Sequence, residues 1–222
     1  KEGCTQSYAA AERCACIPCR KEKVMIDQNW NEEFKKRLTA NYDEMKDLYL
    51  SLYHDEHAFD YFCTMLYDYY SQRPELLKEW DEAREDVPDW FKGNDMLGML
   101  MYTNCFAGNL KGVLSHIDYL KEVGINYLHL MPLLKMPYPD NDGGYAIEDF
   151  RQVDPKIGTN EDLEALAEEL HARGISLCLD FVMNHTYTGH EWFDTAAKYL
   201  SELPEGKEPD SSECKYFDYY HF

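Results

Sequence analysis

The chain has 222 residues, of which 45% are hydrophobic and 14% aromatic, so it can bury a substantial core. Its formal charge is −20, with 22 Lys and Arg against 42 Asp and Glu, and this balance opposes nucleic-acid binding, which needs clustered cations. No apolar run approaches the roughly 20 residues of a membrane span, and we see no hydrophobic signal core. We therefore expect a cytoplasmic protein without a nucleic-acid or membrane partner.

Residues 1–25 show no hydrophobic period and are predicted to form a poorly ordered arm. The arm contains four of the eight cysteines: Cys4, Cys14, Cys16 and Cys19. Structural zinc needs four ligands in a tetrahedral array, and one tight triplet with a distant fourth cysteine is weak support for it. We predict no metal and no cofactor. Zinc-dependent regulation through these thiols is an alternative that would require about one zinc ion per chain.

Residues 26–93 are predicted to form an all-α domain. Apolar side chains recur every three to four positions from Phe34 to Leu52, as on one face of an amphipathic helix. The same spacing recurs from Ala58 to Tyr69, and a third helix begins at Pro74. This segment contains no group of residues with an obvious chemical role.

From residue 94 to 186 the pattern changes to short apolar runs separated by helices. The predicted strands are 96–102, 125–130 and 175–179. Cys105 and Cys178 lie in these apolar surroundings and are expected to be small buried hydrophobes. One helix is predicted from Leu110 to a stop at Gly124, and another follows Thr159, which forms a capping box with Asp162. The predicted helices and strands after residue 94 alternate.

A short repeat connects the second and third strands. Gly124 and Gly174 are 50 residues apart, and each lies between the end of a helix and the start of a strand. Repeated units of this kind build a parallel sheet, either an open doubly wound sheet or a closed (β/α)8 barrel. No Gly-x-Gly-x-x-Gly follows the first strand, which disfavours a dinucleotide-binding sheet. The long loop after the second strand and the polar end of the third favour the barrel.

The third strand ends in a group of polar residues, Asp180-Phe181-Val182-Met183-Asn184-His185. A carboxylate, an amide and an imidazole within six residues lie where parallel sheets place their ligand chemistry. This stretch resembles the first motif of the α-amylase-type (family 13) glycoside hydrolases and transglucosylases. Asp142-Gly143-Gly144-Tyr145, with the segment to Thr159, resembles the amylosucrase-like branch, as do Phe106–Gly112 and His190-Glu191-Trp192. Trp192 itself is expected to pack in the fold and not to stack on sugar.

The resemblance covers residues 30–222 and implies an α/β fold. It would comprise an all-α domain, the first three strands of a (β/α)8 TIM barrel, and, over 187–222, the start of the loop domain after strand three. It also implies a retaining mechanism with a covalent glucosyl intermediate, on sucrose or another α-glucoside. Three residues would then bind glucose: Asp142 and His185 through hydrogen bonds, and Tyr145 through its ring face. Asp180 and Asn184 would organise the loop. The Asn position binds calcium in some amylases. Amylosucrase-like members generally lack this ion.

In this family the nucleophile follows the fourth strand and the acid/base the fifth. The chain shows three barrel strands, so neither reacting carboxylate is expected within it, and the 222 residues alone are predicted to be inactive. We interpret the chain as a truncated piece of a longer enzyme. Sucrose phosphorylase, trehalose synthase and α-glucosidase are near neighbours in the family. A different alternative is a non-catalytic sugar-binding or scaffold protein derived from it. Acceptor and oligomeric state are not predicted.

Overall fold

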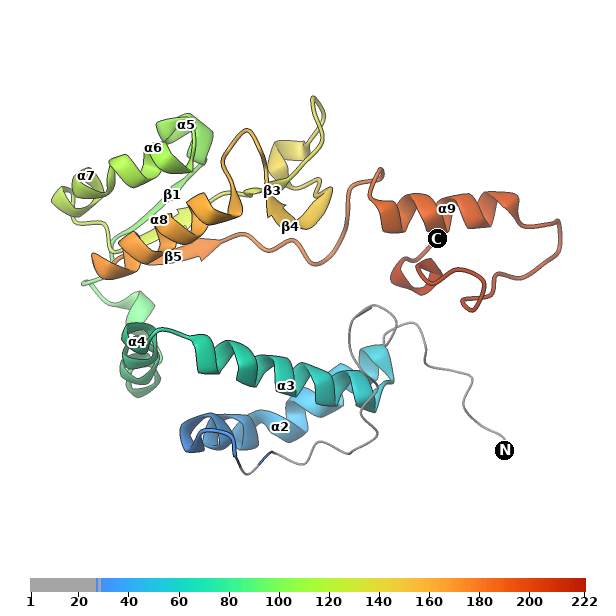
Figure 1. Ribbon diagram of the computed structural model, residues 1–222, viewed down its shortest axis with the longest axis horizontal. Coiled ribbons are helices and arrows are strands. Elements are labelled where there is room, and N and C mark those ends of the chain that lie inside the picture. The colour runs from blue at the N-terminus through green and yellow to red at the C-terminus, as the bar shows by residue number, and fades with distance from the viewer. Residues whose placement is uncertain (1–26, 28) are drawn as a thin grey trace. The chain divides into compact units, whose positions relative to one another are not determined.

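The computed structural model describes residues 27 and 29–222 (Figure 1). The described chain divides into two compact units. One holds the helices up to Lys78 together with Glu205–Phe222, and the other is Glu79–Pro204. The predictions for the arm 1–25 lie outside the described residues, and so do those for its four cysteines: Cys4, Cys14, Cys16 and Cys19.

The helical unit is built on α2 (Glu32–Tyr53) and α3 (Glu56–Gln72), and α4 (Glu75–Asp86) begins in it and continues into the other unit. Asn31 and Asp55 cap the first two helices, since each side-chain oxygen accepts a backbone N–H of the first turn. Large aromatic side chains fill the space between α2 and α3. The buried residues are Trp30, Phe34, Leu38, Phe59 and Cys63. Burial raises the pKa of the Cys63 thiol to about 11, so this cysteine stays protonated at neutral pH.

The other unit contains a parallel sheet with strand order β1-β2-β5. Its strands are β1 (Gly98–Met101), β2 (Tyr127–Leu130) and β5 (Ser176–Leu179), and each pairs in register with its neighbour. The predicted three-stranded parallel sheet after a helical region is therefore confirmed. Because the pairing is in register, Leu100, His129 and Cys178 form one row across the sheet.

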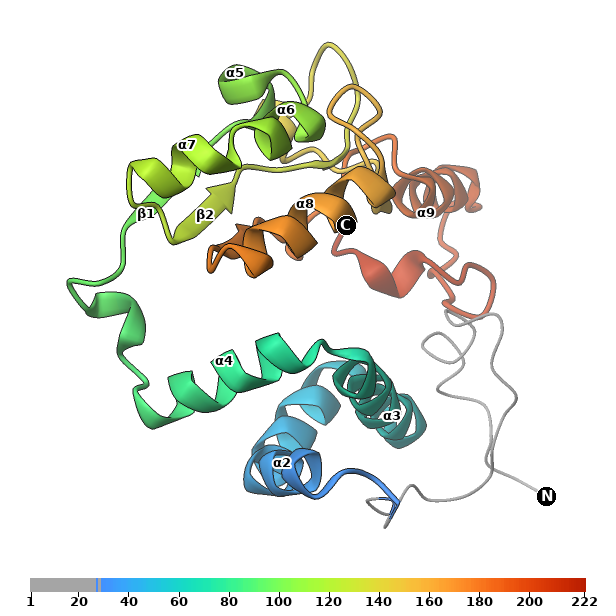
Figure 2. The same ribbon diagram turned by 60° about the vertical axis from the view of Figure 1, so that its left-hand side comes forward.

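Three helices cover one face of this sheet: α6 (Leu110–Ser115), α7 (Ile117–Glu122) and α8 (Asn160–Ala172). Figure 2 shows α7 and α8 beside the strands. The core on this face is almost wholly aliphatic. Its fully buried members include Leu110, Val113, Leu120, Leu128, Leu130, Leu166, Leu170 and Ile175. The capping box of Thr159 and Asp162 at the start of α8 is present as predicted.

The repeat seen in the sequence is a repeated hydrogen-bond pattern. Gly124 and Gly174 both have positive φ, 86° and 73°, which glycine adopts without steric cost. In each copy the next residue donates its N–H back to the helix: Ile125 to Leu120 O at 2.9 Å, and Ile175 to Leu170 O at 2.8 Å. The hydrogen bond caps the C-terminal end of each helix, and a buried isoleucine then leads into the next strand.

Two details of the predicted helices and strands were wrong. The helix expected from Leu110 to Gly124 is broken at His116, whose ring Nδ1 lies 2.7 Å from Gly112 O and so competes with the backbone ladder. The first strand ends at Met101, and a short helix, α5 (Thr103–Ala107), follows it. Cys105 lies on α5 and is exposed, so the expectation that it is buried was also wrong.

The remaining elements lie in connections and near the end of the chain. A 3-10 turn, η1 (Trp90–Lys92), precedes β1, and a short antiparallel pair, β3 (Leu134–Lys135) and β4 (Asp149–Val153), lies in the long loop after β2. The last elements are α9 (Glu191–Glu202) and η3 (Phe217–Tyr219). None of the helices in the described part of the chain has the length and apolar character needed to span a bilayer.

Candidate functional site

The carboxyl ends of the three parallel strands lie at one edge of the sheet, where parallel α/β folds concentrate ligand chemistry. Tyr102 follows β1, the loop 131–153 follows β2, and the loop 180–190 follows β5. Backbone and side-chain hydrogen bonds join the last two loops to each other. All five predicted site residues lie on these two loops: Asp142, Tyr145, Asp180, Asn184 and His185.

Asp142 is placed by a tight 3-10 turn, η2 (Asp142–Gly144), whose residues have positive φ: 50° at Asp142, 67° at Gly143 and 97° at Gly144. Space is also short there. A Cβ atom at Gly144 would lie 3.0 Å from Pro132 Cβ, and one at Gly143 would lie 3.1 Å from the Tyr102 hydroxyl oxygen. Glycine is required at both positions for these two reasons. The turn leaves the Asp142 side chain exposed to solvent.

Tyr145 and Asp180 are joined directly across the two loops. The Tyr145 hydroxyl donates to Asp180 Oδ2 at 2.8 Å, and the other carboxylate oxygen, Oδ1, lies 2.9 Å from His129 Nε2. This hydrogen bond raises the pKa of Tyr145 above its ordinary value, with burial and the charge of Asp180 acting in the same direction. Tyr145 is therefore a neutral hydrogen-bond donor at physiological pH, and its ring is held from the hydroxyl end.

His185 is bound through both nitrogens of its ring. Nε2 lies 3.0 Å from Tyr145 O, and Nδ1 lies 2.8 Å from Asn184 Nδ2. A carbonyl oxygen can only accept, so Nε2 carries the proton, and Nδ1 accepts from the Asn184 amide. In this arrangement Nε2 is the donor of the His185 ring and Nδ1 is the acceptor. A second link between the same loops, Tyr187 N to Ile147 O at 3.0 Å, lies close by.

An aromatic cluster supports the far end of the loop after β5. Phe150 stacks on Trp192 with an angle of 16° between the rings, and the His190 ring meets that of Trp192 edge-on at 4.6 Å. His190 is buried, and its Nδ1 accepts the backbone N–H of Trp192 to cap α9. Burial lowers the pKa of His190, partly offset by Asp149 and nearby Glu side chains. Packing of Trp192 within the fold, as predicted, is what the structure shows.

The sequence reasoning missed two residues at this edge, His129 and Tyr102. His129 is the one polar side chain between Leu128 and Leu130, both fully buried, and this interruption of an apolar strand was the signal that could have found it. Tyr102 had no such signal. Its position near Gly143 depends on how the loop after β2 folds back over the end of β1, which local sequence does not specify.

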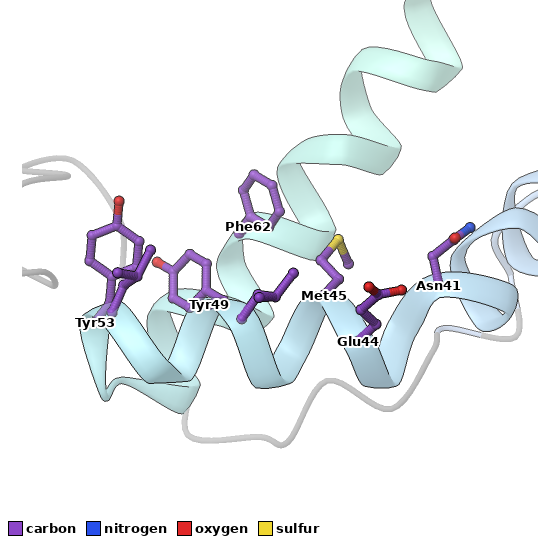
Figure 3. A pocket seen from close by; sticks show the side chains of 8 residues that line it. Asn41, Glu44, Met45, Tyr49, Tyr53 and Phe62 are labelled. Carbon is purple, nitrogen blue, oxygen red and sulfur yellow. The ribbon is translucent and has the colours of Figure 1, made fainter. Parts of the chain in front are cut away.

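The helical unit has a hollow of a different character. It measures about 370 Å³ and lies between α2 and α3, as Figure 3 shows. Its lining is mostly apolar. Phe62 comes from α3, and the other lining residues come from α2: Asn41, Glu44, Met45, Leu48, Tyr49, Leu52 and Tyr53. Glu44 is the sole titratable carboxylate among these lining residues, so the hollow offers no acid/base or nucleophilic pair. The chemistry-bearing groups described above all belong to the sheet unit.

Comparison with known proteins identifies the sheet unit. The catalytic domain of alpha amylase matches residues 87–222, more than half of the chain. The chain belongs to the alpha-amylase family. Oligo-1,6-glucosidase of Heyndrickxia coagulans is 44% identical over 91 residues, which cover 41% of this chain and 16% of that enzyme. Amy13B of Eubacterium rectale, a solved structure, is 38% identical with a TM-score of 0.52, over 56% of this chain and 25% of that one.

The family membership confirms the coarser part of what the motifs predicted. From residue 87 on, the strands and helices form part of an alpha-amylase catalytic domain, the amino-terminal portion of a TIM barrel. The chain spans less than a third of the length of these relatives. A further relative, the alpha-amylase SusG of Bacteroides thetaiotaomicron, is 40% identical over 116 residues, 52% of this chain and 14% of that enzyme.

In some alpha-amylase family members the position of Asn184 binds calcium, and in this chain its side chain has another partner. The Asn184 amide is turned to His185, with its nitrogen 2.8 Å from Nδ1 of that ring. Calcium requires six to eight oxygen ligands, and within residues 27 and 29–222 no group of three or more His, Cys, Asp or Glu side chains could hold a metal ion. We derive no chemical step through a metal.

Proposed function

We propose that Asp142, Tyr145 and His185 form the glucose-binding subsite of an amylosucrase-like enzyme. Such an enzyme transfers or hydrolyses glucose from sucrose or another α-glucoside with retention of configuration, through a covalent glucosyl-enzyme intermediate. The reacting carboxylates would lie outside these 222 residues, so the chain by itself would turn over no sucrose. The proposal has one main support: the three residues lie on two loops that are hydrogen-bonded to each other at the ligand-binding edge of the sheet.

The chemistry of the three groups fits a polyhydroxy ligand. Asp142 presents an exposed carboxylate that can accept hydrogen bonds from sugar hydroxyls, and Tyr145 presents an aromatic ring fixed at its hydroxyl end. The relatives add independent support, because they are named as an oligo-1,6-glucosidase and an alpha-amylase. The Asp142-Gly143-Gly144-Tyr145 sequence and the helical region before the barrel favour the amylosucrase-like branch within the family.

His185 has a specific part in this proposal. Its Nε2–H donates a hydrogen bond to Tyr145 O. Donation to a sugar hydroxyl therefore requires that the ring leave this carbonyl or that Nδ1 be protonated. We propose that a glucose hydroxyl replaces Tyr145 O as the acceptor of the Nε2–H hydrogen bond, and that Asn184 keeps the ring in place through Nδ1. Sugar binding would then replace one hydrogen bond of His185 by another and leave its charge unchanged.

The test is a titration of the 222-residue chain with glucose, followed by two-dimensional NMR. We expect signals from the two loops to shift, and replacing Asp142 by Ala to weaken binding roughly ten- to a hundredfold, because a hydrogen bond to a charged group contributes about 1.5–3 kcal/mol. Asp140→Ala is the matched control: another exposed aspartate of the same loop, for which no change is expected. Equal affinities of the two variants would contradict the proposed subsite, and sucrose turnover by the purified chain would contradict its inactivity.

A further inference from the structure

His129 occupies an unusual position for a polar side chain. It lies on the central strand of the parallel sheet, and its neighbours Leu128 and Leu130 are fully buried under the helices on one face. Successive residues of a strand alternate between faces, so His129 points to the other face, in the row it shares with Leu100 and Cys178. About a third of its side chain, 30%, is exposed.

Asp180 belongs to the same face, two residues after Cys178, and its carboxylate connects His129 to Tyr145. Oδ1 lies 2.9 Å from His129 Nε2, and Oδ2 lies 2.8 Å from the Tyr145 hydroxyl oxygen. An ionised carboxylate only accepts hydrogen bonds, so both partners donate, and His129 carries its proton on Nε2. Rotation of the Asp180 carboxylate would break both bonds together. The hydrogen bond from His129 therefore helps to hold the Asp180 carboxylate in the orientation that accepts the Tyr145 hydroxyl, and the reverse also holds.

We propose that His129 is a positioning residue for the sugar subsite: through Asp180, it holds the Tyr145 ring in the orientation that receives the sugar. This inference rests on the proposed function, in which the Tyr145 ring binds a sugar. Its structural part stands on three residues from three different segments of the chain joined in one chain of hydrogen bonds. His129 takes no part in the apolar packing of β2, because Leu128 and Leu130, which do, point to the opposite face of the sheet.

The raised pKa of Tyr145 gives a direct readout of this arrangement, since its main cause is the hydrogen bond to Asp180. In tyrosine-labelled protein the phenol of Tyr145 can be titrated by NMR, with its signal assigned by the Tyr145→Phe variant. In His129→Leu, Asp180 is free to turn away, and we expect the pKa of Tyr145 to fall toward its ordinary value of about 10. In His129→Gln the side-chain amide can donate from nearly the position of Nε2, and we expect the pKa to be restored.

Glucose affinity is measured on the same variants. We expect His129→Leu to bind glucose roughly three- to tenfold more weakly than the parent chain, about the effect of losing one hydrogen bond, and His129→Gln to recover most of this loss. An unchanged or higher Tyr145 pKa in His129→Leu overturns the positioning role. If the Tyr145 pKa is the same in the parent chain, in His129→Leu and in His129→Gln, His129 has only a structural role in packing.

Two further measurements keep the test decisive. If His129→Leu does not fold, the ring ¹⁵N shifts of His129 in the parent chain report its tautomer: protonation at Nε2 supports the proposal, and protonation at Nδ1 alone overturns it. Failure of the proposed function is distinguished by the glucose titration of the parent chain. Absence of glucose binding with a Tyr145 pKa that still depends on His129 would refute the sugar subsite and leave the hydrogen-bonded arrangement standing.

Discussion

The two units of this chain use different means to pack their helices. Between Trp30 and Lys78 there is no glycine, and α2 meets α3 through rings such as the stacked pair Tyr49 and Phe62, whose centroids are 5.7 Å apart. The sheet unit uses aliphatic side chains and glycines, and its polar groups are gathered at one edge. The hydrogen-bonded loops of the candidate site occur in the sheet unit, where Gly143 and Gly144 adopt the positive φ that their tight turn needs.

Exposed apolar side chains also differ in meaning between the units. On α2, Leu48 is 61% and Leu52 72% exposed, beside the hollow between the two helices. On the sheet, Leu100 is 61% exposed on the face opposite the helices. In a complete (β/α)8 barrel that face is the interior and is filled by layers of side chains. The sheet unit's exposed face is thus explained by its family, whereas nothing in the family match, which begins at residue 87, accounts for that of α2.

The largest effects are expected from truncating the core of either unit. Phe59 is fully buried among the aromatic side chains of α2 and α3, and Leu128 is fully buried under the helices of the sheet. We expect Phe59→Ala to cost about 3–5 kcal/mol and Leu128→Ala about 2–5 kcal/mol of unfolding free energy, measured by hydrogen exchange of the elements around each site. Leu48→Ala, at an exposed position, is the control and should stay within about 0.5 kcal/mol.

These two variants sharpen the comparison of packing. Aromatic packing leaves a larger void when a ring is removed, so the loss at Phe59 should exceed the loss at Leu128. A smaller loss at Phe59 than at exposed Leu48 would show that the helical unit does not have the packed core described here.

A smaller effect is expected from the close backbone contact of α5 and α6. A Cβ atom at Gly112 would lie 2.0 Å from the backbone oxygen of Ala107, so the two short helices would have to move apart. We expect Gly112→Ala to destabilise the sheet unit by about 1–3 kcal/mol, measured by chemical denaturation. Lys111→Ala changes the preceding, exposed residue and should be nearly neutral. Equal stability of both variants would contradict the close approach as the reason for this glycine.

The sequence predicted most of the fold because its signals are local. Helix ends at Gly124 and Gly174 and the capping box at Thr159 depend on residues within a few positions, and the structure has all three. The break at His116 and the short helix containing Cys105 were missed because side-chain competition and loop geometry overrode the apolar period. For α2, the period correctly predicted that Phe34 and Leu38 are buried, but it could not tell that Leu48 and Leu52 would be left exposed.

The candidate site was predicted in part, for a related reason. Motif resemblance named the residues, and the parallel order of the strands predicted that the loops carrying them share one edge. The individual hydrogen bonds could not be predicted, since each joins residues 35 to 51 positions apart through loop conformations set by tertiary contacts. His129 belongs to this class: its role depends on where Asp180 and Tyr145 finally lie.

The smallest expected effect concerns pH and compares a buried histidine of the sheet unit with an exposed one of the helical unit. Burial lowers the pKa of His190 below 6.5, so the folded chain takes up this proton at lower pH than the unfolded chain. The stabilisation is fully present above pH 6.5 and is lost as pH falls from there through the folded-state pKa. Protonation would also remove the Nδ1 acceptor that caps α9.

The variant that isolates this effect is His190→Asn, because asparagine can still cap the helix but does not titrate. We expect the fall in melting temperature between about pH 7.5 and about pH 5.5 to be smaller in His190→Asn than in the parent chain. The control is His54→Asn: His54 is exposed at the end of α2 with φ of 52°, a conformation that asparagine tolerates, and its replacement should leave the pH dependence unchanged. A parent-like pH dependence in His190→Asn would mean that burial does not lower the pKa of His190, and that this residue stabilises α9 through packing alone.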